Sequence, residues 1–146
     1  MKKTLTVLMV ASITLLGCNQ SEKVTLDPSK PYDLRITVTG ITEEGGNIYV
    51  AVRDESNTVV AEHVVQAEEA ASASTVLLKQ IPAGEYDIFT FQDIDGNNML
   101  TMAGTMPKEP LGYSGNNILA GPPQFSSTSF TLAKDSEQTV RLFDYR

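Results

Sequence analysis

The residues best suited to chemistry in this sequence stand in an acidic turn, residues 93–98, with the sequence DIDGNN. The side chains of Asp93, Asp95 and Asn97 alternate along the chain and can therefore converge, and the Thr101 hydroxyl lies close enough to join them. Hard cations such as Ca²⁺ take several oxygen ligands from a tight loop. The turn therefore predicts a weak Ca²⁺ site of the extracellular type, and no other cofactor is expected.

A turn without a metal is the alternative reading of the same residues. The EF-hand pattern fits in neither register, because Gly96 falls at the fourth position when Asp93 is the first ligand, instead of the sixth. Placing Gly96 sixth makes Phe91 the first ligand, and neither register ends in Glu. Asp and Asn side chains also bond to their own backbone, so the residues fit an Asx-rich turn between a strand and a loop better than they fit a metal site.

Nucleophilic catalysis has little support. His63 is the single histidine, so a Ser-His-Asp triad would have to use it, and its Glu-rich surroundings fit a solvated surface residue better. Ser114 superficially resembles a nucleophile elbow, but the G-x-S-x-G motif needs glycine where this chain has Asn116. We interpret Ser114 as part of a turn and predict no catalytic residue.

A pair of carboxylates is the alternative route to an enzyme. Asp93, Asp95 or Glu109 could serve a hydrolase of envelope glycans or small esters, which needs a groove and one acid with a raised pKa. Turn acids flanked by Asn are expected to be exposed, which argues against that chemistry. We therefore expect a non-enzymatic binding or structural module and keep the hydrolase as the alternative.

A long loop, residues 101–125, follows the turn and is rich in proline and glycine. Loops of this length in compact domains are usually functional or disordered, and the apolar residues spread through this one argue against disorder. Tyr113, Asn116, Asn117 and Phe125 could form a surface for a protein or glycan partner. The alternative is that the aromatic residues fix the loop to a sheet.

Alternating apolar residues predict the strands that must position these features. They include residues 34–39 and 48–53, joined by a hairpin loop at 43–47, then 75–81, a turn at 81–84, and 85–91. Residues 127–132 and 138–145 are predicted to form a closing hairpin, with Phe130 and Leu132 facing Val140 and Leu142.

Residues 54–74 allow two readings, because 61–71 could form two helical turns while the valines at 59, 60, 64 and 65 favour a short edge strand. Strands that recur with short turns and no long helix predict an all-β fold. We expect a single antiparallel two-sheet sandwich of about seven strands, with one long Pro/Gly-rich loop.

Several motifs in this region also resemble a family of exported bacterial domains of unknown function, numbered 2141. The family pattern combines PPGxYA, HDxNGNGxLD, G-x-PxExxGFSNN and GPPxF in that order. The matching segments here are residues 82–86, 93–100, 104–117 and 121–125. The resemblance extends from Leu34 to the C-terminus, with Gln92 and Thr101 in place of the pattern's His and closing acid. It implies an envelope or secreted β-sandwich similar to transthyretin-like modules, with no established activity.

The N-terminus carries an export signal. Two lysines precede a short apolar run, residues 5–16, which is typical of a secretory leader and too short to span a membrane. Leu15-Leu16-Gly17-Cys18 resembles a bacterial lipobox, in which Cys18 becomes the lipidated first residue. We predict a lipoprotein signal peptide at 1–17, a lipidated tether at 18–32 and a β-sandwich domain at 33–146.

Charge restricts the partners. The formal net charge is −7 and becomes −9 once the leader's two lysines are removed, so nucleic acid is excluded as a partner. The same charge disfavours anionic headgroups, which leaves the lipid anchor as the contact with the membrane. Asn19 after the lipidated cysteine favours the outer membrane of a Gram-negative cell envelope. We expect a monomer.

Overall fold

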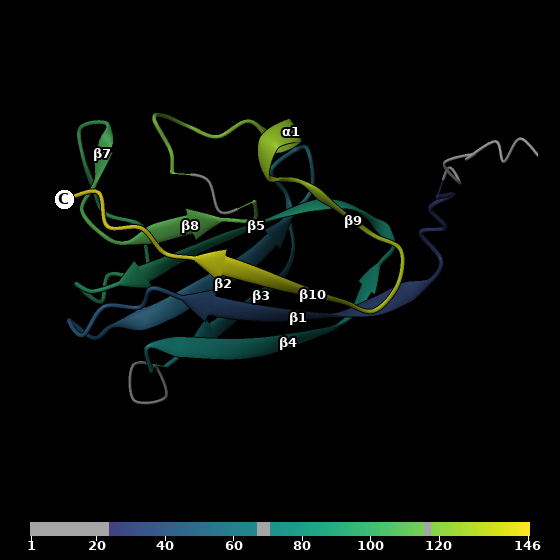
Figure 1. Cartoon of the computed structure of the whole chain (residues 1–146), viewed down its shortest axis with the longest axis horizontal. Helices are drawn as coiled ribbons and strands as arrows, with labels where there is room; N and C mark the ends of the chain where they lie inside the picture. Colours follow the sequence, from purple (N-terminus) through teal and green to yellow (C-terminus); the bar gives the residue numbers. More distant parts are fainter. Residues whose placement is uncertain (1–23, 67–70, 116–117) are drawn as a thin grey trace, which may run out of the picture.

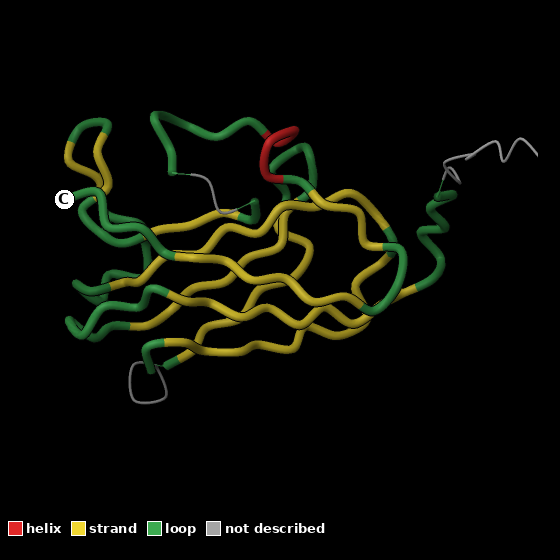
Figure 2. Tube along the Cα trace, viewed as in Figure 1, coloured by secondary structure: helices red, strands yellow, loops and turns green. Residues whose placement is uncertain are grey.

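The structure is a computed structural model that describes residues 24–66, 71–115 and 118–146. The leader, Cys18, Asn116 and Asn117 lie outside the described residues. The described ranges form ten β-strands and one short helix, which pack as a sandwich (Figure 1, Figure 2). They are β1 Pro31–Thr39, β2 Asn47–Arg53, β3 Val59–Val65, β4 Ala73–Pro82, β5 Gly84–Asp93, β6 Met102–Ala103, β7 Met106–Pro107, β8 Leu111–Tyr113, α1 Phe125–Thr128, β9 Phe130–Leu132 and β10 Ser136–Arg141.

Two main sheets make up the sandwich. The first has the strand order β10-β1-β4, and the second has the order β3-β2-β5-β8, with β9 added along the start of β5. β1 and β10 run parallel, whereas the other strand pairs in the described residues are antiparallel. The all-β class with packed antiparallel sheets is therefore confirmed. Within the ambiguous segment 54–74, residues 59–65 form the edge strand β3, and residues 67–70 lie outside the described residues. Likeness to transthyretin stays a prediction.

Both predicted hairpins are wrong, namely the one that joins residues 34–39 to 48–53 and the one that joins 127–132 to 138–145. β1 and β2 lie in different sheets, so residues 40–46 cross from one sheet to the other. β9 and β10 do not pair either, because β9 joins β5 while β10 joins β1. Alternation of apolar residues shows that a strand has one buried face, but both sheets of a sandwich bury such a face, so the pattern does not select the partner.

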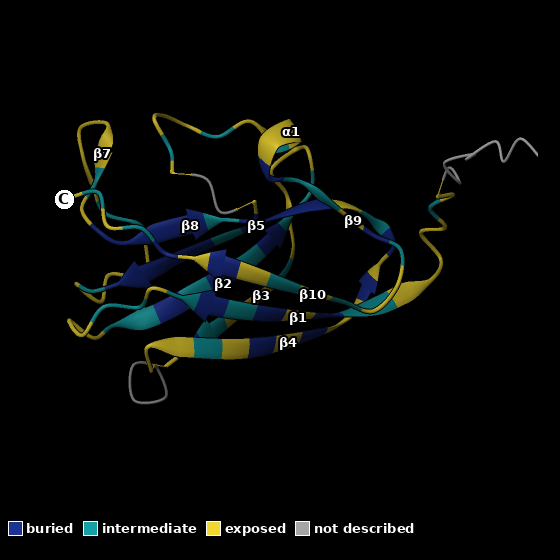
Figure 3. Ribbon diagram, viewed as in Figure 1, coloured by how far each residue is buried: buried dark blue, intermediate teal, exposed yellow. Residues whose placement is uncertain are grey.

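The core lies between the two sheets and is built by the inward residues of the alternating strands. These are dark blue in Figure 3, and the fully buried ones include Leu34, Ile36, Val38, Ile48, Val52, Ile88, Leu132 and Val140. The opposite face of β5 carries Asp87, Phe89, Phe91 and Asp93. Asp87, Phe91 and Asp93 are nevertheless buried, so chain beyond the strands covers this face.

The two ends of the sandwich differ in what they carry. At the entry end, where residues 24–30 lead into β1, Pro31 lies opposite Pro82 and Ala83 alone separates β4 from β5. At the distal end, Asn47 at the start of β2 lies opposite Asp93, which begins the acidic turn. β1 spans nine residues, or about 30 Å, between these ends (Figure 1). No helix in the described part of the chain is long and apolar enough to cross a membrane.

Candidate functional site

The acidic turn starts from a buried aspartate. Asp93 is the last residue of β5 and has no exposed surface. Its Oδ1 accepts hydrogen bonds from the backbone N–H groups of Gly96 at 2.9 Å and Asn97 at 3.1 Å. Its Oδ2 accepts one from Asn98 N–H at 2.9 Å. The turn therefore wraps around this carboxylate, and the expectation that its acids lie in water is wrong for Asp93.

Glu109 enters the same cluster from the far side of the loop. It is 2% exposed, and its Oε1 accepts hydrogen bonds from the N–H groups of Ile94 at 2.8 Å and Asp95 at 3.3 Å. Its Oε2 accepts one from Thr101 N–H at 2.9 Å. From the sequence, Glu109 is expected as a possible hydrolase carboxylate but not as a ligand of the turn, because its contact with the turn depends on the path of the loop. The one nearby sequence feature that indicates burial of Glu109 is the apolar pair Pro110 and Leu111 directly after it, and both of these residues are buried.

The remaining predicted ligands bond to one another at the surface. The Thr101 hydroxyl donates to Asp95 Oδ2 at 2.8 Å and accepts from the Asn97 amide at 2.6 Å. Asn97 also accepts the backbone N–H of Met99 at 2.7 Å. Asp95, Asn97 and Thr101 thus form the outer layer of the site, above the buried Asp93 and Glu109.

Three carboxylates meet in this site. Oxygens of Asp93, Asp95 and Glu109 lie within 4.8 Å of one another. Charges of one sign at this distance repel, and here the partial positive charges of the bonded backbone N–H groups offset the repulsion. Asp93 Oδ2 and Glu109 Oε2 each accept one backbone N–H, which leaves lone pairs that a cation can share. Since Ca²⁺ takes 6–8 oxygen ligands, three carboxylates suit a cation that keeps much of its water.

A second buried acid lies six positions earlier on the same face of β5. Both oxygens of Asp87 bond to the Arg53 guanidinium, at 3.0 and 2.7 Å, and Oδ2 also accepts the Thr128 hydroxyl at 3.2 Å. The guanidinium lies over the Phe89 ring, 5.1 Å from its centroid, and over Tyr113 at 5.2 Å. Burial raises the pKa of the Tyr113 phenol. This cluster joins β2, β5, β8 and α1.

The predicted partner residues are thereby placed. Tyr113 belongs to β8 and packs against Phe89 with ring centroids 5.1 Å apart, which fits the reading that aromatic residues fix the loop to a sheet. Phe125 begins α1 and is half-buried. Asn116 and Asn117 lie outside the described residues.

The residues considered for nucleophilic catalysis do not come together. His63 lies exposed on β3, as expected. Ser114 is 2% exposed, and its hydroxyl accepts Ile88 N–H at 2.8 Å and donates to the Thr128 carbonyl at 2.6 Å. It therefore links β5 to α1, in agreement with a structural rather than a nucleophilic role.

Gln92 is a structural residue that the sequence did not reveal. Its fully buried amide donates to the carbonyls of Thr42 at 3.0 Å and Gly45 at 2.7 Å and accepts Thr42 N–H at 2.9 Å. Gly46 beside it has φ 95°, and a Cβ there would lie 2.1 Å from the Asp93 carbonyl oxygen. These contacts hold residues 40–46, which cross between the sheets, against the start of the acidic turn.

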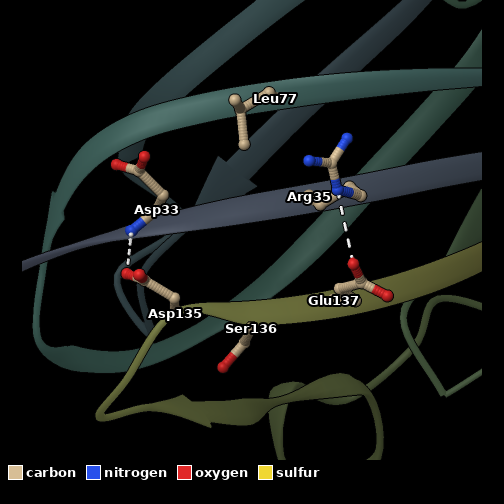
Figure 4. Close-up of a pocket in the computed structure, with 6 residues that line it drawn as sticks. All are labelled: Asp33, Arg35, Leu77, Asp135, Ser136 and Glu137. Carbon is tan, nitrogen blue, oxygen red and sulfur yellow. Dashed lines mark hydrogen bonds and ion pairs between the residues drawn. The ribbon is translucent and has the colours of Figure 1, made fainter.

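A shallow pocket of about 310 Å³ lies near the entry end, on the outer surface of the first sheet. Its lining residues are Asp33, Arg35, Leu77, Asp135, Ser136 and Glu137 (Figure 4). Asp135 accepts Asp33 N–H at 2.9 Å, and Arg35 pairs with Glu137 at 3.3 Å with both side chains largely exposed. Exposed pairs of this kind contribute little, and the polar groups here already have protein partners.

Comparisons with known proteins place the chain in a family and supply no activity. The model of a family described as "Uncharacterized protein conserved in bacteria (DUF2141)" matches residues 36–141. No curated protein matches. A fimbrial assembly protein from Parabacteroides distasonis ATCC 8503 is similar in structure, with a TM-score of 0.48 and 12% sequence identity. The match covers 78% of this chain and 53% of that protein, so this chain spans about half of its length.

Proposed function

Because the chain belongs to the family of uncharacterized bacterial proteins DUF2141, whose description names no activity, we propose a function from the site itself: a lipid-anchored envelope module that binds a partner and catalyses no reaction. The observation that supports it is the use of the two buried carboxylates. Asp93 and Glu109 each accept three backbone N–H groups, and these bonds give the distal loops one conformation.

Those bonds work against acid–base catalysis. A general acid or base must point a carboxylate oxygen at its substrate, whereas hydrogen bonds from backbone N–H groups hold the oxygens toward the protein backbone. Both oxygens of Asp93 and of Glu109 accept such bonds. The two residues therefore suit a rigid scaffold better than proton transfer.

The anchor is tested through Cys18, which carries the predicted lipid. In Cys18→Ser the full-length chain should remain unprocessed or be released into the soluble fraction, because a lipid anchor holds a protein through the apolar chains it buries. Cell fractionation and mass spectrometry of the N-terminus measure this, with Ser21→Ala as a neighbouring control that should behave as the wild type. Normal membrane retention of Cys18→Ser would refute the anchor. Because Asn19 follows the predicted lipidated cysteine, we propose the outer membrane as the location of the protein.

Weak Ca²⁺ binding at the acidic turn belongs to the same proposal. A cation bound only by the folded state raises the unfolding midpoint, and ~10 mM Ca²⁺ with a dissociation constant of ~1 mM adds about 1.4 kcal/mol. Thermal unfolding in EDTA and then in Ca²⁺ should show a rise that Asp95→Asn removes and Asp135→Asn keeps. Coincident melting curves for the wild type would leave an ordinary turn.

The second candidate is a hydrolase, and the closeness of the two buried carboxylates favours it. Incubation of the purified chain with cell-wall glycans and small esters separates the two candidates. We expect no turnover above that of Glu109→Gln, a variant that lacks one of the carboxylates. Turnover that disappears in this variant, while the variant remains folded by circular dichroism, would establish the hydrolase.

A further inference from the structure

Every methionine beyond the predicted leader lies on, or directly before, one small hairpin formed by β6 and β7. The chain has five, of which Met1 and Met9 stand in the leader, and Met99, Met102 and Met106 fall within residues 99–107, named here the methionine hairpin. These three side chains are 68%, 47% and 52% exposed. Three exposed large apolar side chains on one short segment are available to a partner, and methionine adapts to irregular apolar surfaces.

The base of the methionine hairpin is fixed by the acidic site. Lys108 N–H donates to the Thr101 carbonyl at 2.9 Å, and Thr101 N–H donates to Glu109 Oε2 at 2.9 Å. At the tip, Gly104 has φ 63°, which allows the tight reversal between β6 and β7. A segment ordered before binding loses less entropy on binding. The buried carboxylate thus holds an exposed apolar element in a binding-ready shape.

The register of the hairpin separates its methionines. Met102 lies opposite Pro107, and Ala103 lies opposite Met106. Paired residues share a face and successive residues alternate, so Met102 and Met106 point to opposite faces. Thioethers on opposite faces are poorly placed to hold one soft metal ion between them. Two apolar faces on one projecting hairpin suit insertion into a cleft whose walls cover both.

Charge at the base of the hairpin is negative in sum, because the three carboxylates of the acidic site outnumber Lys108, the one exposed cation among the described residues there. Asp95 is exposed and bonds to Thr101 at the hairpin base, and Glu43 is exposed on the crossing between the sheets at the same distal end. The chain as a whole carries a net charge of −7. Complementary charge orients partners during association, so the rim of the cleft should carry Lys or Arg.

We propose that the methionine hairpin is the docking element for a partner protein that has an apolar cleft with a basic rim. The inference rests on the proposed binding function and names its surface. The hairpin belongs to the distal end, opposite the end where the tether enters (Figure 1). A lipid-anchored chain therefore presents the hairpin away from its own tether.

Site-specific photo-crosslinking in the native cells tests the proposal on the full-length chain. The crosslinking amino acid replaces Thr105 at the exposed hairpin tip, and a matched probe replaces Thr75, exposed on the outer face of the first sheet. We expect one discrete adduct with another protein from Thr105 and none from Thr75. Raising the salt concentration from ~50 mM to ~500 mM should reduce the adduct, because screening weakens charge complementarity.

Two sets of substitutions identify the chemistry. Replacing all three methionines with leucine keeps their apolar surface and should keep the adduct within about twofold. Replacing them with serine removes that surface and should lower the adduct at least about tenfold. Loss of the adduct in the leucine set would show that apolar surface alone does not support docking, and would overturn the proposal.

Other outcomes also overturn it. An adduct of twice the chain's own mass would identify a second copy as the occupant, and no adduct from Thr105 would exclude docking through the hairpin. An adduct from Thr75 alone would move the partner surface to the first sheet and leave the non-enzymatic module standing. Glycan or ester turnover by the purified chain would instead remove the proposed function.

Discussion

Two buried acids on the same face of β5 are neutralised in different ways. Asp87 faces the Arg53 guanidinium, a full opposite charge from the neighbouring strand, and Asp93 faces three backbone N–H groups of its own turn. An ion pair between strands connects elements whose backbone is already held by sheet hydrogen bonds. Backbone N–H groups that donate to a carboxylate instead fix the conformation of a turn that lacks such sheet hydrogen bonds.

The two sites also have different roles: the Asp87 site stabilises the domain, whereas the Asp93 site fixes the conformation of the exposed distal loop. The Asp87 site joins β2, β5 and α1 in the body of the sandwich through Arg53 and Thr128. The Asp93 site, with Glu109, holds the loop that carries the methionine hairpin. Damage to the first should affect the whole domain, whereas damage to the second should act mainly at the distal end.

The largest effect is expected from Arg53→Met. Removing the guanidinium leaves Asp87 buried without its countercharge, which should cost about 3–5 kcal/mol of unfolding free energy. Urea denaturation measures the loss. The double variant Arg53→Met with Asp87→Leu should recover most of the loss. A single variant within ~1 kcal/mol of the wild type would show that the pair is not the main support of this region.

Glu109→Gln should have a smaller effect that stays local. The glutamine –NH₂ group cannot accept a hydrogen bond, so with the carbonyl oxygen kept toward Ile94 and Asp95 the Thr101 N–H loses its partner, at a cost of about 2 kcal/mol. Hydrogen exchange should accelerate at Ile94, Asp95 and Thr101 more than in β1. Glu137→Gln, at an exposed acid of β10, is the matched control and should leave exchange unchanged. Uniform acceleration across both sheets would contradict the comparison.

Thr101→Asp should add a fourth carboxylate to the site, so that the backbone N–H groups no longer offset the repulsion and a bound cation stabilises the fold. The new carboxylate replaces the hydroxyl that donates to Asp95 Oδ2, so repulsion should lower the melting temperature in EDTA. Added Ca²⁺ should then raise it by more than in the wild type. Thr101→Ser keeps the donor and serves as the control. Equal Ca²⁺ responses in Thr101→Asp and the wild type would refute this role of the hydroxyl.

The smallest effect concerns an exposed acid at the distal end. Hydrogen bonds from the Arg146 side chain, which also pairs with Glu44, lower the pKa of Asp144 to about 2. Because the pKa is lower in the folded state, the contribution to stability is present above ~3.9 and is lost as pH falls toward the folded value. Carboxyl titration by NMR should show the low pKa in the wild type and a pKa closer to the ordinary value in Arg146→Gln, which keeps only the backbone N–H bond to Asp144. An unchanged pKa in that variant would assign the shift to another cause.

Sequence alternation predicted individual strands well and their partners poorly. Residues 34–39, 48–53, 75–81 and 85–91 all lie within observed strands, because each strand has one face in the core. The hairpins failed because a crossing between sheets and a turn within one sheet use the same residue types. The crossing at 40–46 depends on the buried Gln92 amide, which comes from a strand far along the chain.

The residues of the candidate site that are close together in the sequence could be predicted, whereas the contact with Glu109 could not. The DIDGNN segment identified Asp93, Asp95, Asn97 and Thr101 as neighbours, since local hydrogen bonds in a turn follow from local sequence. Glu109 joins them only through the loop path, and the burial of Asp93 depends on how the turn folds back over it. No periodic pattern encodes either contact.

The parallel pairing of β1 with β10 affects when the fold can form. Leu34 lies opposite Ser136 and Asp33 bonds to Asp135, contacts that close 102 residues of chain. During synthesis, the first strand emerges long before its parallel neighbour, so the first sheet stays incomplete until β10 has followed. For the exported chain that we propose, this order disfavours premature folding of the leading end.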